Sequence, residues 1–228
     1  MQPGALNHTY VLQIGPLGIS DVVVTTWAIM LILWLAAWVS TRALKESPGS
    51  WQTAIEGIVS ALEDAVGSVV PEHKDLVMPF VGTLWVYLVV ANLAGLLPGL
   101  HAPTGNLSAT TALAVLVFLS VHWFGIRTQG FRRYLLHYIR PNPILLPFHI
   151  ISEITRTVAL AVRLFGNMMS LEMAGLLVLL VAGLLAPVPI LMLHVVEALV
   201  QAYLFGMLAL IYIAGGLQTQ VLREQEKE

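Results

Sequence analysis

The sequence contains 228 residues, of which 57% are hydrophobic and only 11% are charged, and its formal net charge is −2. Soluble domains carry roughly a quarter charged residues, so this composition excludes an ordinary soluble domain and indicates a polytopic membrane protein. The small net charge argues against a nucleic-acid partner, and the absence of cysteine excludes disulfides, thiolate metal sites and cysteine nucleophiles.

The sequence predicts five membrane-spanning helices. The N-terminal segment MQPGALNHTY has no basic stretch followed by an apolar core, so we expect no cleavable signal peptide before them. A spanning helix needs about 20 mostly apolar residues, and the segments that meet this requirement are 22–40, 76–97, 108–126, 147–186 and 189–222. The last two would each exceed about 50 Å as helices, against a hydrocarbon core of about 30 Å. We therefore expect both to be strongly tilted, within a single all-α membrane domain spanning residues 1–228.

Residues 50–70, between the first two spans, predict an amphipathic helix. Apolar residues recur there at the spacing of one helix face: Ile55, Ile58, Val59, Leu62 and Val66. Glu56, Glu63 and Asp64 occupy other positions. Such a helix lies on the membrane surface or against a protein partner, and its acidic face favours protein contact over anionic lipid.

The basic loops predict the orientation of the chain. Lysines and arginines follow the first and third spans: Arg42, Lys45, Arg127, Arg132, Arg133 and Arg140. The loop at 101–106 and the turn at 186–189 contain none. Because basic loops stay cytoplasmic, we expect the N-terminus outside and the C-terminus inside, which agrees with five crossings.

Arg163 is a permanent cation within the apolar stretch TVALAVRLFGNMMSLEMAG (157–175). A charge at the bilayer centre costs about 2.5–3.5 kcal/mol on insertion scales, so a functional role with a partner is the default interpretation. At about 100° per residue, the same face holds Arg156, Ala159, Gly166, Asn167, Ser170 and Ala174. Small residues allow a second helix to approach closely, so we predict a closely packed neighbour that carries the anion. Glu172 is about 180° around the helix from Arg163 and cannot be that anion.

Two further polar groups lie on either side of Arg163 along the chain. His194, Glu197 and Gln201 are spaced i, i+3 and i+7 and so share one side of the last helix. With Glu172 they are expected in the outer half of the membrane. The inner half is expected to contain His149, Ser152, Glu153, Thr155 and Arg156.

Simpler interpretations stay open for several of these residues. Arg156 can extend to the cytoplasmic interface, His149 and Glu153 can cap the start of a helix, and His194 alone fits a hydrogen-bonded core histidine. Asn92 fits a polar contact between helices. The remaining histidines, His122 among them, are assigned no role.

Common enzyme motifs are missing from the sequence. It has no G-x-x-x-x-G-K-[ST] loop, no H-E-x-x-H and no serine elbow, and two ligands such as His149 and Glu153 are too few for a metal site. We therefore expect no metal, no cofactor and no nucleotide site. Two classes remain: an ion-conducting subunit of a larger machine, or a stand-alone ion-coupled secondary transporter. The chain shows no internal repeat of the kind common in transporters, which favours the subunit.

The chain resembles subunit a of F-type ATP synthases, the membrane stator subunit that carries the ion channel. The resemblance rests on Arg163-Leu164-Phe165-Gly166-Asn167-Met168, on Glu172 and His194, and on the segment QAYLF that begins at Gln201. The stretch NLAGLLP (92–98) and the five-span layout with a surface helix are also similar. The likeness covers most of the chain from about Trp51 onward.

This resemblance implies a function, partners and a location. It implies two offset half-channels facing a rotating ring of c subunits, each with a membrane-embedded carboxylate, and Arg163 as the stator arginine that separates the half-channels and displaces the ion from those carboxylates. Asn167, Glu172, His194 and Gln201 match polar positions of the ion pathway, to which we add Glu197, Arg156 and Glu153. Implied partners are the c-ring, the peripheral-stalk b subunits, the membrane lipid and, indirectly, the F1 sector. The implied location is the bacterial inner membrane.

The sequence also departs from the family pattern. Glu197 is an additional acid, and Thr157 stands where the family often has proline. With the PTGNLS loop (103–108), these features resemble variant ATPases, some of which use Na⁺, so the sequence is compatible with either H⁺ or Na⁺ as the coupling ion.

Overall fold

The computed structural model describes residues 10–14, 17–42, 49–97, 102–132, 134, 146–182 and 187–218. A short antiparallel hairpin comes first, formed by β1 (Tyr10–Ile14) and β2 (Leu17–Ser20). The α-helices that follow are α1 (Asp21–Arg42), α2 (Ser50–Val69), α3 (Lys74–Ala94), α4 (Leu107–Gln129), α6 (Leu146–Ala182) and α7 (Pro187–Gln218). Two short 3-10 turns, η1 (Pro71–His73) and η2 (Pro103–Gly105), precede α3 and α4.

Five of these helices are long and apolar enough to cross a membrane, which confirms the predicted all-α polytopic fold. The five are α1, α3 with the η1 turn before it, α4, α6 and α7, and α2 is the additional amphipathic helix. The ends differ from the predicted segments by a few residues, and the predicted residues 183–186 and 219–222 lie outside the described part of the chain. The hairpin before α1 was not predicted.

Local sequence determines where α4 begins and ends. Asn106 precedes the helix, and its side-chain oxygen accepts a hydrogen bond from the Ser108 backbone N–H at 2.9 Å, which satisfies one of the free donors of the first turn. Gly130 follows the helix with φ +79°, a conformation that favours glycine. The segment 107–129 is therefore bounded by residues suited to the two ends of a helix.

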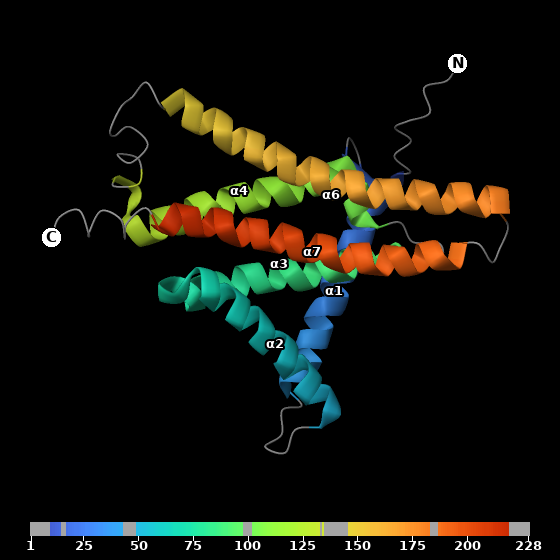
Figure 1. Cartoon of the computed structure of the whole chain (residues 1–228), viewed down its shortest axis with the longest axis horizontal. Helices are drawn as coiled ribbons and strands as arrows, with labels where there is room; N and C mark the ends of the chain where they lie inside the picture. The colour runs from blue at the N-terminus through green and yellow to red at the C-terminus, as the bar shows by residue number, and fades with distance from the viewer. Residues whose placement is uncertain are drawn as a thin grey trace.

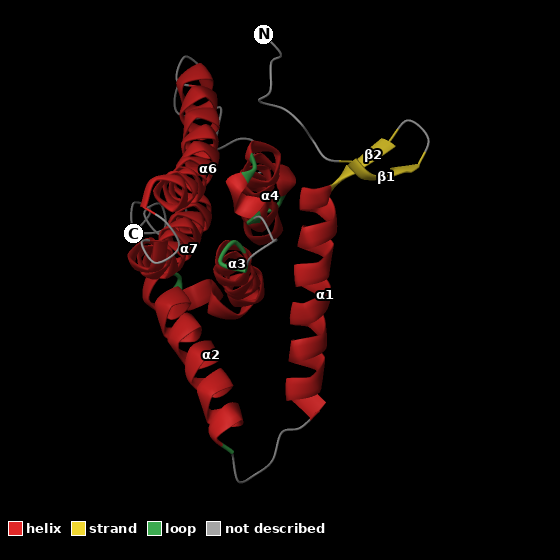
Figure 2. Ribbon diagram, turned by 90° about the vertical axis from the view of Figure 1, so that its right-hand side faces the viewer, coloured by secondary structure: helices red, strands yellow, loops and turns green. Residues whose placement is uncertain are grey.

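The spanning helices do not all run in one direction. In Figure 1, α3, α4, α6 and α7 run along the long axis of the molecule, and in Figure 2, which looks along that axis, α1 runs across it. Helices that cross in this way cannot all be perpendicular to one membrane plane. At about 1.5 Å per residue, α1 is about 33 Å long and α6 about 55 Å, so α1 matches the hydrocarbon thickness and α6 must be inclined to fit.

The core is formed by the four aligned helices. Leu88 of α3, Leu164 and Met168 of α6 and Phe205 of α7 are at most 1% exposed and belong to one apolar cluster, which α4 joins through Val117. Burying each such side chain contributes about 1.5–3 kcal/mol when the alternative is water. Where the surroundings are lipid, close packing of these side chains stabilises the helix contacts instead.

A close approach between α3 and α7 occurs at Gly206. The indole of Trp85 lies directly against this glycine, where a Cβ atom would collide with the ring. The Trp85 N–H donates to the Tyr203 carbonyl oxygen at 3.3 Å, and the two aromatic rings stack with their centroids 6.3 Å apart. The missing side chain at position 206 thus allows the two backbones to meet.

The amphipathic helix α2 is only partly covered by its own chain. Val66, near its C-terminal end, is fully buried against α3 and α7, and Glu63 pairs with Lys74 at 3.3 Å. Trp51 and Ile58, nearer the N-terminal end, are 75% and 57% exposed. The end of α2 that carries Trp51 therefore lies away from the helix bundle (Figure 2).

Candidate functional site

Arg163 lies at the middle of α6 on a face that the rest of the described chain leaves open. The residues predicted to share its face are exposed or half-buried: Arg156, Ala159, Gly166, Asn167, Ser170 and Ala174. The core contacts of α6 come instead from the other side of the helix, through Leu160, Leu164 and Met168. No hydrogen bond or ion pair within the described ranges involves Arg163. The described residues therefore provide no anion for this cation.

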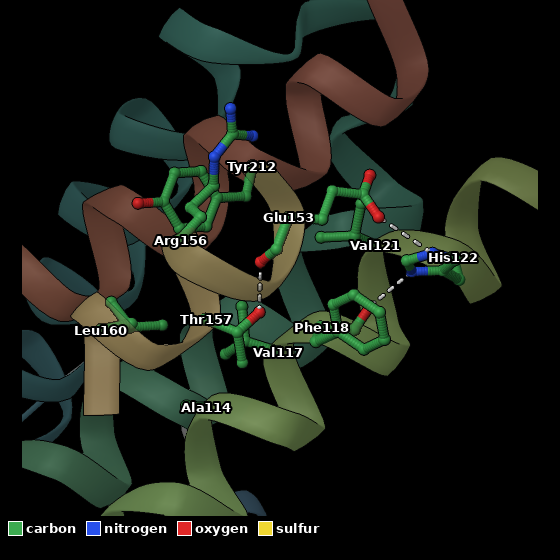
Figure 3. Close-up of a pocket in the computed structure, with 10 residues that line it drawn as sticks. All are labelled: Ala114, Val117, Phe118, Val121, His122, Glu153, Arg156, Thr157, Leu160 and Tyr212. Atoms are coloured by element: carbon green, nitrogen blue, oxygen red, sulfur yellow. Dashed lines mark hydrogen bonds and ion pairs between the residues drawn. The ribbon is translucent and has the colours of Figure 1, made fainter. Parts of the chain in front are cut away.

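A pocket lies on the N-terminal side of Arg163, between α4, α6 and α7 (Figure 3). Its polar groups are His122, Glu153, Arg156, Thr157 and Tyr212. The Nε2 atom of His122 is 3.3 Å from Oε2 of Glu153, and their side chains are 28% and 26% exposed. The pocket therefore holds a half-buried acid–base pair that links α4 to α6.

Arg156 has an aromatic partner in this pocket. Its guanidinium carbon lies 4.7 Å from the centre of the Tyr212 ring on α7, a distance at which the cation is attracted to the ring face. The arrangement keeps the charge of Arg156 at the pocket, between α6 and α7 (Figure 3). The predicted extension of Arg156 to the interface is therefore not needed to explain its position.

A second polar cluster lies on the other side of Arg163 along α6. The Asn167 amide N–H donates to Oε1 of Gln201 at 2.7 Å, joining α6 to α7. Gln201 is 1% exposed and His194 is 7% exposed, and the Nε2 atoms of both are buried and have no hydrogen-bond partner among the described residues. Buried polar atoms are rarely left unpaired, and water commonly fills such positions. The arrangement therefore suits a hydrated path between the two helices.

The η2 turn closes over this second cluster. Thr104 donates to Oδ1 of Asn92 at 2.7 Å, and Nδ2 of Asn92 donates to the Ala198 carbonyl at 3.1 Å. Both side chains are completely buried. Glu172 reaches the same turn, because its Oε2 atom lies 3.1 Å from the Cβ position of Gly105. These contacts hold the acid of α6 beside the turn that precedes α4.

The predicted site residues thus fall into two groups separated by Arg163. Glu153 and Arg156 line the pocket, and Asn167 contacts Gln201 directly. His194 and Glu197 lie on the same side of α7 as Gln201, the first buried and the second half-buried. Glu172 lies against η2. Within the part of the chain that the structure describes, no group of three or more His, Asp or Glu side chains is arranged to hold a metal.

His122 and Tyr212 are site residues that the sequence alone did not reveal. Neither belongs to a polar stripe that its own helix shows in the sequence, and the polar contact of each that defines the pocket is made with a residue on another helix. The one available signal was that a histidine within the span 108–126 requires a partner. Asn92 was predicted as an interhelical contact, and its bonds to Thr104 and to the α7 backbone confirm that interpretation.

Comparison with known proteins gives consistent matches over nearly the whole chain. The family model described as ATP synthase A chain matches residues 23–214. The chain is 62% identical over 216 residues to ATP synthase subunit a 2 of Pelobacter propionicus, covering 95% of each protein. It is 54% identical over 225 residues to ATP synthase subunit a of Legionella pneumophila, covering 98% of this chain and 97% of that one. It is 60% identical over 207 residues to ATP synthase subunit a 1 of Hahella chejuensis, covering 91% and 88%.

Proposed function

The chain belongs to the ATP synthase A chain family, and from this premise we propose that it provides two offset ion half-channels to a ring of c subunits, separated by Arg163. The observation that carries the proposal is the exposed face around Arg163, a cation in the middle of α6 without an anionic partner among the described residues. Membership of this family makes the chain the ion-translocating stator subunit of a rotary ATPase. It argues against the alternative of a stand-alone secondary transporter.

Arg163 forces the ion off each arriving ring carboxylate. Arginine keeps its proton under all physiological conditions, so its charge favours the ionised carboxylate over the protonated or Na⁺-bound form. The same charge repels a cation that would pass directly from one half-channel to the other. An ion that enters on one side must therefore travel around with the ring before it leaves on the other side.

The two polar groups supply the half-channels in this proposal. Glu153 and Arg156 belong to the inner one, and Glu172, Asn167, His194, Glu197 and Gln201 belong to the outer one. Their position along α6 supports this division, since Glu153 and Glu172 are about 15 Å and 13 Å from Arg163 along the helix axis, in opposite directions. Neither group alone extends from one end of α6 to the other.

The proposed setting is a bacterial inner membrane, in which residues 1–228 form one membrane domain. The basic residues after α1 and α4 support a cytoplasmic location for these loops, with the N-terminus outside and the C-terminus inside. The c-ring would contact the Arg163 face, and the peripheral-stalk b subunits would contact other exposed helices. The F1 sector is then an indirect partner.

Replacing Glu172 with glutamine tests the outer half-channel. The variant keeps the shape of the side chain beside η2 but removes its charge, and we expect ATP-driven ion pumping to slow roughly tenfold, a modest loss for a proton-transferring group. Pumping is measured as the initial rate of membrane potential in inverted vesicles that contain the assembled complex. Glu197→Gln is expected to slow pumping in the same way. Glu72→Gln, at an exposed acid of η1, is the matched control and should pump normally. Normal rates in Glu172→Gln would remove this carboxylate from the path.

A further inference from the structure

We propose that His122 and Glu153 together form a proton-holding site in the inner pocket, through which protons pass between the cytoplasmic water and the inner half-channel. This inference rests on the proposed function, since it places a step within the inner half-channel. It adds His122, a residue of α4, to a path otherwise assigned to α6 and α7.

The hydrogen bonds of His122 define how many protons the pair holds. Its Nδ1 atom is 2.9 Å from the Phe118 carbonyl oxygen, and a carbonyl only accepts, so Nδ1 carries a hydrogen. Its Nε2 atom faces Oε2 of Glu153 at 3.3 Å. A hydrogen bond between these two atoms requires one more proton, placed either on the imidazole or on the carboxyl group.

The pair can therefore exist in two states that differ by one proton. With the shared proton its net charge is zero, and without it the pair is a neutral imidazole beside a carboxylate. Uptake forms one N–H or O–H bond and converts a hydronium ion to water, and release is the reverse. No oxidant, reductant or metal is needed for either step.

Other charged and ionisable groups lie near the pair. Arg156 lines the same pocket, with its guanidinium group over the Tyr212 ring. Among the described residues, the other ionisable groups near the pair include the phenols of Tyr212, which lines the pocket, and Tyr134, whose ring lies 5.9 Å from that of His122. They also include His149, which stands one turn before Glu153 on α6. Both members of the pair are about a quarter exposed, and in this proposal the exposed part faces the water of the inner half-channel.

The position of the pair places it near the entrance of the inner half-channel. His122 precedes Arg127, the basic residue in the last turn of α4, by about 7.5 Å along the helix. Glu153 precedes Arg163 by about 15 Å along α6. Protons that reach the pair from the cytoplasmic side, where the arginine-rich loops lie, have therefore covered the first part of the distance to Arg163.

A purely structural role for the pair, a tether between α4 and α6, predicts different behaviour. Glutamine at position 122 offers a donor of similar reach toward Glu153, and asparagine offers a donor toward the Phe118 carbonyl, but neither titrates. A tether would be preserved by at least one of these variants, whereas a proton-holding site is lost in both. Either variant tests the proposal if the other fails to assemble.

The experiment measures ATP-driven membrane potential in inverted vesicles that contain the assembled complex, without added Na⁺, over a range of medium pH. In such vesicles the medium bathes the cytoplasmic side, from which protons are taken up. We expect His122→Gln and His122→Asn to pump about tenfold more slowly than wild type at neutral pH. The pumping rate falls as the pH of the medium rises, and we expect this fall to begin at a lower pH in the two variants than in wild type. The reason is that a carboxyl group without the imidazole keeps its proton only in a more acidic medium. His73→Gln, at a half-buried histidine outside the pocket, should match wild type.

The outcomes separate this proposal from the proposed function. If wild type pumps protons and both variants pump at the same rate with the same pH dependence, the proton-holding site is wrong and the half-channel function stands. If wild type pumps Na⁺ in place of protons, the site is likewise wrong. If wild type hydrolyses ATP in the fully assembled complex and moves neither protons nor Na⁺, the proposed function itself fails.

Discussion

Replacing Arg163 with alanine is expected to abolish ATP-driven ion pumping while the complex still assembles. The side chain is exposed on α6 and contributes no hydrogen bond or ion pair to the described fold, so its removal leaves the packing around Leu164 and Met168 intact. What is lost, under the proposed function, is the fixed charge that displaces the ion from the ring carboxylate. Without that charge nothing at the interface favours the ionised ring carboxylate over its ion-bound form, so the ion is not released there.

Inverted vesicles without added Na⁺ provide the measurement for this prediction. Wild type should acidify its lumen when ATP is added, and Arg163→Ala should give no acidification above background. Arg127→Ala, at an exposed arginine in the last turn of α4, is the control and should pump normally. Pumping by Arg163→Ala at the wild-type rate would contradict the stator assignment. If wild type hydrolyses ATP without acidification, uptake of ²²Na⁺ identifies the coupling ion.

Arg163→Lys distinguishes a permanent charge from a conditional one. Lysine carries the same formal charge, but a desolvated ammonium group gives up its proton far more readily than a guanidinium group does. We therefore expect Arg163→Lys to assemble and to remain defective in pumping. Full activity in this variant would mean that any nearby cation is sufficient.

Replacing Gly206 with alanine is expected to have the largest effect on stability. A methyl group there would collide with the indole of Trp85, which is 4% exposed and is held by its bond to the Tyr203 carbonyl and by stacking on the Tyr203 ring. The ring cannot move aside without losing these contacts, so α3 and α7 must separate. Overpacking of this kind costs about 1–3 kcal/mol or more, and we expect the upper end of that range.

The amount of assembled chain in membranes and the thermal stability of the purified complex measure this effect. Gly215→Ala on the same helix is the matched control, because a Cβ atom there meets no other described side chain within 4 Å. Gly206→Ala should be depleted and thermally labile, and Gly215→Ala should resemble wild type. Equal stability of the two variants would show that the α3–α7 contact is looser than described.

The features that could be predicted from the sequence are those determined within one helix. Spans depend on the hydropathy of about 20 consecutive residues, and the face of α6 that carries Arg163 follows from the 3.6-residue period. The structure adds that this face is the exposed one and that Leu160, Leu164 and Met168 face the core. The closely packed partner on the side of the small residues stays a prediction, because no other described helix covers that face.

The features that could not be predicted depend on how one helix is placed against another. The contacts of His122 with Glu153, of Arg156 with Tyr212 and of Trp85 with Gly206 join residues 31 to 121 positions apart. No local pattern determines the relative axial position of two helices, which results from the packing of all of them. The hairpin before α1 was missed for another reason, because its strands of five and four residues are too short for a clear periodic signal.

The most direct test of the central claim is disulfide cross-linking between the Arg163 face and the ring. The chain has no native cysteine, so a single introduced cysteine is the only thiol that this chain brings to the reaction. Ser170→Cys lies on the exposed face of α6, two turns beyond Arg163, and Leu119→Cys lies on α4 at a position that is 59% exposed. Each is combined in the assembled complex with a cysteine placed one or two helical turns from the membrane carboxylate of the c subunit and is treated with a mild oxidant. We predict a cross-linked product with Ser170→Cys and none with Leu119→Cys, and the reverse pattern would contradict the docking of the ring on the Arg163 face.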